Sequence, residues 1–179
     1  FLTPASAEPY IPAEGTAVLE NLAFDLAREA SELSAQLHPV VRLSVTDFVR
    51  SMNCYYSNLI EGHNTHPIDI ERTLRNDYSA DRHKRNLQIE ARAHIAVQNW
   101  IDEGGSRPAW TSAEAICELH RRFYEELPDD LRWAEDPDTG VRSEIIPGRL
   151  RHLDIRVGRH IGVSPGAVPR FLGRFAEGF

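Results

Sequence analysis

Apolar side chains recur at steps of three and four over most of the chain, which is the period of one helix face. The clearest example runs from residue 44 to residue 60, where Ser44 is placed to cap a helix and Gly62 to end it. Because the apolar stripe is wide, we expect most of this helix to be buried. The stripe consists of Val45, Phe48, Val49, Met52, Tyr55, Tyr56, Leu59 and Ile60.

The same period predicts further helices, several of which carry recognisable start and stop residues. Thr111 and Glu114 form a capping box, Pro67 lies in a first turn, and Gly104 follows a last turn. Residues 1–15 contain three prolines and are expected to form an irregular arm. The additional helices are expected at residues 16–37, 66–75, 81–103, 111–127 and 164–175.

Alternation typical of a strand occurs at one place, where Leu153, Ile155 and Val157 are separated by charged residues. A glycine follows, so a short β-hairpin is the expected form. The segment 128–148 is rich in Asp, Pro and Gly and is expected to loop. The predicted fold class is therefore mainly α, a helical bundle with one short β-hairpin.

Composition narrows the classes of function. The chain has 179 residues and a net charge of −7, which argues against a nucleic-acid-coating surface. It has no run of about 18 apolar residues that would predict a membrane span. The two cysteines are far apart and show no zinc-binding or disulfide spacing. We therefore expect a cytoplasmic protein that makes no membrane contact.

The central helix carries a polar flank beside its apolar stripe. Arg50, Asn53, Ser57 and Glu61 fall together there at about 100° per residue. A carboxylate on the last turn opposes the helix dipole, which is a local cost. Glu61 is therefore either solvated at a fraying end or directed at a cation from another part of the fold, and spacing alone leaves both interpretations open.

The histidines show no catalytic or metal-binding spacing. His63 and His66 are three residues apart, but no third ligand is placed near them, so a polar connector is favoured over a metal site. His120 lies next to the apolar face of its helix, without a nucleophile or carboxylate placed beside it by spacing. We favour a buried, hydrogen-bonded structural role for His120 over a catalytic one.

Three stretches together resemble the Fic family. Residues 57–62 (SNLIEG) resemble its [ST]-x-x-x-E-[GN] inhibitory motif, in the class that carries this motif before the catalytic core. Residues 118–120 (ELH) match the family's first core helix, and residues 148–175 resemble its flap and the helix that follows. The matching flap positions are Gly148, Arg151, Ile155, Val157, Gly158, Pro165 and Pro169.

One departure from the family pattern is decisive for activity. Fic enzymes carry H-P-F-x-[DE]-G-N-G-R beyond the flap and the next helix, and this motif is absent here. The resemblance implies an N-terminal arm and first helix at residues 1–40 and an inhibitory helix with its supports at residues 41–110. The first part of a truncated Fic core would occupy residues 111–179. We therefore expect no catalytic and no metal-binding residue in this chain, and no activity from it alone.

The resemblance also implies roles for two groups of residues. Ser57, Glu61 and Gly62 would be inhibitory, with Glu61 pairing with the arginine of the missing motif and denying it to the γ-phosphate of ATP. Residues 155–157 (Ile155, Arg156 and Val157) would form the flap strand that docks the target. The parent is expected to move AMP from ATP, with Mg²⁺, to a hydroxyl side chain of a target protein, whereas this fragment needs no cofactor.

Two alternatives remain beside that expectation. The chain is alternatively a non-catalytic helical module that binds another protein, like an antitoxin subunit whose inhibitory helix acts in trans. A second alternative keeps the Fic fold but changes the reaction to removal of AMP or transfer of another phosphate-containing group. The sequence is also compatible with a homo-oligomer, and it does not identify the target protein.

Overall fold

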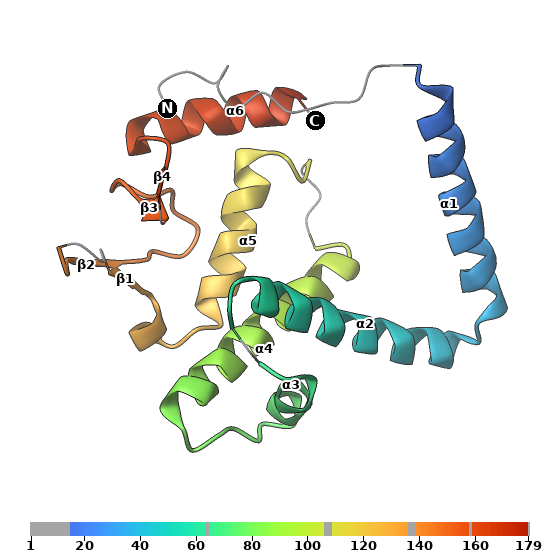
Figure 1. Cartoon of the computed structure of the whole chain (residues 1–179), viewed down its shortest axis with the longest axis horizontal. Coiled ribbons are helices and arrows are strands. Elements are labelled where there is room, and N and C mark those ends of the chain that lie inside the picture. Colours follow the sequence, from blue (N-terminus) through green and yellow to red (C-terminus); the bar gives the residue numbers. More distant parts are fainter. Residues whose placement is uncertain (1–14, 64, 106–108, 136–138, 158, 179) are drawn as a thin grey trace.

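The computed structural model describes residues 15–63, 65–105, 109–135, 139–157 and 159–178. Over these residues the chain is mainly helical and carries short antiparallel β-hairpins (Figure 1). The helices are α1 (Ala17–Gln36), α2 (Pro39–Ile60), α3 (Pro67–Leu74), α4 (Arg82–Asp102), α5 (Ala113–Glu125) and α6 (Val168–Gly178). The strands are β1 (Trp133–Glu135), β2 (Arg142–Glu144), β3 (Arg156–Val157) and β4 (His160–Ile161).

The predicted fold class, mainly α with a short hairpin, is confirmed. Strand β3 pairs with β4 where the alternation predicted a strand, although the ladder begins only at Arg156. A second hairpin, β1–β2, lies in the segment that was expected to loop, with Trp133 opposite Glu144. The guanidinium of Arg142 lies 5.1 Å from the centre of the Trp133 ring, a cross-strand cation–π contact that no alternation pattern reveals.

The buried core is small and lies where α2, α3 and α4 meet. Cys54, Ile70, Ala91 and Ile95 form one cluster, with Tyr55 packed against it. The small side chains of Cys54 and Ala91 allow α2 to approach α4 closely, so that the cysteine Sγ lies 3.6 Å from the Ala91 carbonyl oxygen. This cluster holds the second half of α2 in place.

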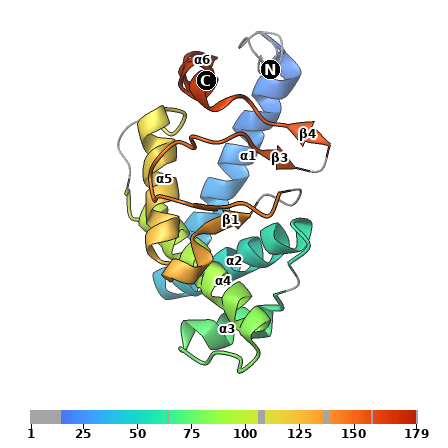
Figure 2. The same ribbon diagram turned by 90° about the vertical axis from the view of Figure 1, so that its left-hand side faces the viewer.

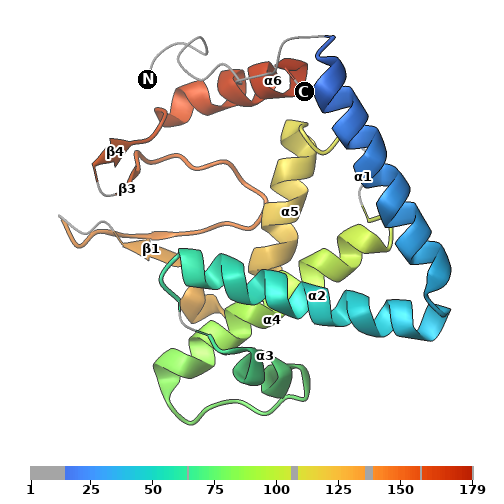
Figure 3. The same ribbon diagram turned by 45° about the vertical axis from the view of Figure 1, so that its right-hand side comes forward.

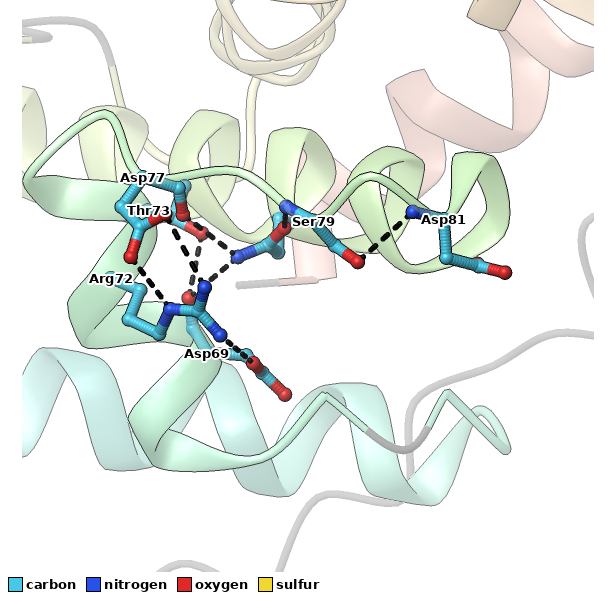
Figure 4. A network of polar contacts seen from close by, with 7 residues as sticks. Asp69, Arg72, Thr73, Asp77, Ser79 and Asp81 are labelled. Carbon is cyan, nitrogen blue, oxygen red and sulfur yellow. Dashed lines mark hydrogen bonds and ion pairs between the residues drawn. The ribbon is translucent and has the colours of Figure 1, made fainter.

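A buried amide closes the turn between α3 and α4. Gln88 is 1% exposed, and its Oε1 accepts a hydrogen bond from the Ser79 amide at 2.8 Å. Its Nε2 donates to the carbonyl oxygens of Asp69 and Asp77, at 3.2 and 3.3 Å. Figure 4 shows the ion pair of Arg72 with Asp77 alongside, which ties the end of α3 to the same turn. Gln88 therefore satisfies backbone groups that burial would otherwise leave unpaired.

The expectation that most of the central helix is buried is wrong. Among the described residues of α2 only Cys54 is buried, whereas Phe48 is 65% and Ile60 is 83% exposed. Helix α1 has no buried residue and turns away from α2 to form one side of the molecule (Figures 1 and 3). The apolar stripes of both helices thus lack a covering element among the described residues. No helix in that part of the chain has the length and apolar character needed to cross a membrane.

Three helix starts differ from the prediction. Helix α6 begins at Val168, after a 3₁₀ turn at Pro165–Ala167, and not at residue 164. Helix α2 begins at Pro39, five residues before Ser44, because proline is favoured in a first turn and His38 adopts the extended conformation that a following proline requires. The hydroxyl of Ser44 instead donates to the Val40 carbonyl inside the helix, and the boundary expected at residue 40 falls in the first turn. Helix α5 is capped by Ser112, whose Oγ accepts from the Ala115 amide at 3.1 Å, and not by Thr111.

We predict that Gln88→Met destabilises the fold by about 2–4 kcal/mol, because it leaves buried backbone groups without partners. Gln98→Met is the matched control on the same helix, since the Gln98 Nε2 is buried and has no hydrogen-bond partner among the described residues. That control should change stability by less than about 1 kcal/mol. Urea unfolding followed by circular dichroism measures both. Equal losses in the two variants would show that Gln88 acts only by packing.

Candidate functional site

The carboxyl end of α2, which carries the predicted inhibitory residues, is anchored on α4 through Cys54. The Cys54 side chain is fully buried, and burial raises the pKa of its thiol to about 12. The amide Nδ2 of Asn58 lies 3.9 Å from the same sulfur, one turn further along the helix. The thiol therefore stays protonated at neutral pH and acts as a small packing group beneath the last turns of α2.

The polar flank of α2 makes a second attachment to α4. Arg50 reaches Asp102 at the end of α4, with Nε and Nη2 at 2.8 and 2.7 Å from one carboxylate oxygen. Asp47 pairs with the same guanidinium at 2.6 Å. Arg50 is only partly exposed, so these contacts fix the side chain more firmly than a fully solvated pair would. Sequence spacing placed Arg50 on the flank but gave no signal that Asp102 was its partner.

Helix α2 ends in a Schellman turn centred on Gly62. The backbone of Gly62 has φ of +81°, a left-handed conformation that residues other than glycine adopt at a cost. Its amide donates to the Leu59 carbonyl at 3.1 Å, and the His63 amide donates to the Asn58 carbonyl at 2.7 Å. These two bonds satisfy carbonyl groups that the helix end would otherwise expose. The sequence-based stop at Gly62 is confirmed.

The two predicted inhibitory side chains lie on the surface at this turn. Ser57 and Glu61 are both exposed, and the Glu61 amide donates to the Ser57 carbonyl at 3.3 Å. Within the described part of the chain, the Glu61 carboxylate has no ion pair and the Ser57 hydroxyl has no hydrogen bond. Glu61 thus presents an uncompensated charge at the negative end of a helix dipole.

A histidine and a half-buried carboxylate connect the turn to α4. The Nδ1 of His63 lies 3.6 Å from an oxygen of Glu90. Burial raises the pKa of Glu90, while the nearby His63 and His83 lower it to a lesser degree. Burial and, to a lesser degree, the same carboxylate raise the pKa of Tyr124 on α5. Sequence reasoning missed Glu90, because a contact between residues 27 positions apart leaves no local pattern.

The predicted flap residues lie in the hairpin β3–β4. Ile155 precedes β3, and its carbonyl accepts from the Gly162 amide at 3.0 Å, which closes the hairpin next to the pairing of Arg156 with Ile161 and of Val157 with His160. Both Ile155 and Arg156 have exposed side chains. A Cβ on Gly162 would lie 2.7 Å from the Ile155 side chain, so glycine is required for this close approach.

Arg151 holds the base of this hairpin together. Its Nη1 donates to the Leu153 carbonyl at 2.8 Å, and its Nη2 donates to the Val163 carbonyl. The guanidinium thereby joins the segment before β3 to the segment after β4. Arg151 is one of the positions that match the Fic flap in the sequence, but its two backbone partners were not predicted.

His120 connects the core helix α5 to the start of this segment. Its Nδ1 accepts a hydrogen bond from the Gly148 amide at 3.0 Å, and its ring packs on Tyr124 with centres 4.6 Å apart. Burial lowers the pKa of His120, which favours the neutral ring that can accept this bond. The expected hydrogen bond of His120 is confirmed, whereas its expected burial is wrong, because the side chain is only half-buried. Gly148 has φ of +76° and packs against Arg121, where a Cβ would lie 3.0 Å from the arginine Cβ.

The two groups of predicted site residues lie in different parts of the molecule. In all three ribbon views the hairpin β3–β4 and α6 lie toward one end and α3 lies at the other, with the carboxyl end of α2 between them (Figures 1, 2 and 3). Helix α2 packs on α3 and α4, whereas α6 packs on α5. No group of three or more His, Cys, Asp and Glu side chains among the described residues is arranged to hold a metal ion.

Comparisons with known proteins give no relative: no protein-family model, no curated protein and no solved structure matches this chain.

We predict that Gly62→Ala destabilises the chain by about 1 kcal/mol, because the left-handed backbone disfavours a Cβ although nothing lies within 4 Å of it. Gly173→Ala is the control, since Gly173 lies inside α6 with equally open space around it. Alanine there should stabilise by about 0.5–1 kcal/mol. Thermal unfolding measures both changes. A shift in the same direction for both variants would contradict the proposed role of the turn.

Proposed function

We propose that this chain is the N-terminal part of an autoinhibited Fic protein whose complete form transfers AMP from ATP to a hydroxyl side chain of a target protein. The proposal rests on motifs that occur in the family's order, beginning with residues 57–62 and ending with the flap and its following helix. In this account Glu61 is the inhibitory residue. The parent requires ATP and Mg²⁺, and we assign none of the described residues to either.

The observation that supports this role best is the state of Glu61. Its carboxylate is exposed and has no ion pair within the described residues, yet it stands at the end of a helix that Cys54 holds on α4 and that Arg50 ties to α4 about three turns earlier. A solvated charge on a fraying end needs no such support. A carboxylate that pairs with an arginine of the continuing chain requires a fixed position, because charge-assisted hydrogen bonds depend on geometry.

Inhibition follows from competition for one cation. An arginine paired with Glu61 would not be available to the γ-phosphate of ATP, so the nucleotide would not be held in a productive position. Gly62 allows the chain to turn immediately after the carboxylate. Ser57 lies one helical turn before Glu61, where its hydroxyl can orient the carboxylate or the last turn. The flap residues 155–157 would bind the target segment by strand addition.

A second candidate is a helical module that inhibits a separate enzyme in trans. The exposed apolar stripes of α1 and of the first half of α2 favour it, because such surfaces on a small protein mark binding sites. The coding sequence after residue 179 separates the two candidates: an H-P-F motif supports the enzyme, and a stop codon supports the trans-acting module. In either case we expect a cytoplasmic protein, in which α1 and α2 also offer a surface for a homo-oligomer.

The direct test uses the chain extended beyond residue 179 through the catalytic motif. We predict that Glu61→Gly raises incorporation of AMP into the protein itself by about 5–150-fold, which corresponds to the usual range of coupling energies between regulatory and active sites. The measurement is intact-protein mass after incubation with ATP and Mg²⁺, compared with the wild type. Residues 1–179 alone should show no incorporation.

Glu103→Gly is an unusually close control for this test. Glu103 caps the end of α4 and is followed by Gly104 with φ of +83°, so it repeats the Glu–Gly helix end of α2 in a different place. The variant should leave AMP incorporation at the wild-type level. A comparable rise in AMP incorporation in both variants would mean that loosening any helix end activates the enzyme. No AMP incorporation in any form of the protein would contradict the adenylyltransferase proposal.

A further inference from the structure

Charge is distributed very unevenly along the chain. Residues 1–140 contain 13 Lys and Arg against 24 Asp and Glu, a net charge of −11. Residues 141–179 contain seven Arg against three Asp and Glu, a net charge of +4. The positive part is the segment that holds the hairpin β3–β4 and helix α6. A field of this kind attracts an anionic partner to the hairpin and repels it from the rest of the molecule.

The hairpin also offers backbone groups at its edges. In an antiparallel ladder, hydrogen-bonded and non-hydrogen-bonded residue pairs alternate. The Gly162 amide donates to the Ile155 carbonyl, so the next pair, Arg156 and Ile161, is a non-hydrogen-bonded one. The backbone amides and carbonyls of Arg156 and Ile161 therefore point away from the partner strand. The sheet consists of β3 and β4, and no further described strand covers either outer edge. An extended segment can add to such an edge through main-chain hydrogen bonds.

Several arginines lie in the hairpin or in the segment that leads to it. Arg156 lies in β3, Arg159 lies in the turn, and both are exposed. Arg149 is exposed on the segment that leads to the hairpin. Arg151, by contrast, is committed to the Leu153 and Val163 carbonyls and serves to hold the hairpin in shape. The sequence around the hairpin therefore carries positive charge in addition to the arginine that clamps its base.

From these observations we infer that the hairpin β3–β4 selects an acidic, extended protein segment, which adds to the sheet as a strand and whose carboxylates are attracted by Arg149 and Arg159. This inference rests on the proposed function, in which the hairpin docks the target, and it adds the chemical class of that target. A nucleic acid would meet the same arginines but would gain nothing from the strand edge, and the other 140 residues would repel it.

The test measures binding of fluorescein-labelled peptides to residues 1–179 by fluorescence anisotropy. One peptide alternates Glu with Thr and Val, and the other replaces each Glu by Gln, so both keep the same strand propensity. We expect the Glu peptide to bind at least about tenfold more tightly at 50 mM salt, with the difference shrinking as salt rises. Equal affinity for the two peptides would overturn the inference.

Charge-reversal variants locate the site. The double variant Arg149→Glu/Arg159→Glu should lose the tenfold preference, whereas Arg75→Glu/Arg85→Glu, which makes the same change in net charge just after α3 and on α4, should keep it. An equal loss in both variants would show that only net charge matters and would overturn the inference. Tighter binding of single-stranded DNA than of the Glu peptide would overturn it in favour of nucleic acid.

These readouts are independent of the AMP-transfer test. Selective peptide binding without AMP incorporation in the extended chain would support the docking surface and contradict the proposed reaction. A rise in AMP incorporation in the Glu61→Gly variant without selective peptide binding would support the proposed reaction and contradict the inference of an acidic target.

Discussion

The close packing of α2 on α4 is the contact on which the rest of this structure depends. It is made by small groups, because Cys54 fits against the Ala91 carbonyl only where neither helix carries a bulky side chain. Ile70 from α3 and Ile95 from α4 complete the cluster. The cluster fixes the second half of α2, and with it the turn at Gly62 and the carboxylate of Glu61.

Polar contacts attach the neighbouring helix ends and turns to that packed core. Arg50 joins α2 to the end of α4 through Asp102, and Gln88 closes the turn between α3 and α4. On the other side of the molecule His120 accepts from the Gly148 amide and so positions the segment that leads to the hairpin β3–β4. The two groups of proposed functional residues are therefore supported separately, one by the contact of α2 with α4 and the other by α5.

Much of the fold could be predicted from periodicity, and the reasons for the failures are specific. The helix over residues 44–60 was predicted because its stripe repeats every three to four residues, but the same stripe was wrongly expected to be buried. Periodicity identifies an apolar face and says nothing about which element covers it. The hairpin β1–β2 was missed because its strands have three residues each and its contact of Arg142 with Trp133 joins positions that show no local alternation.

The candidate site was predictable only in part, for a similar reason. The motif at residues 57–62 was visible because its residues are neighbours in sequence. The contacts of Arg50 with Asp102 and of His63 with Glu90 could not be predicted, because each joins positions that are distant in the sequence. Arg151 occupied a recognisable pattern, yet its clamp between the Leu153 and Val163 carbonyls follows from the folded hairpin alone.

The most direct test of this account is the rate at which Cys54 is alkylated by iodoacetamide in the folded chain, measured by peptide mass mapping and compared with the rate in denaturant. Because the side chain is fully buried and its pKa is raised to about 12, the account predicts labelling slower by at least about a hundredfold. Comparable rates in the two conditions would show that α2 is not held on α4, and the fixed position of Glu61 would lose its support.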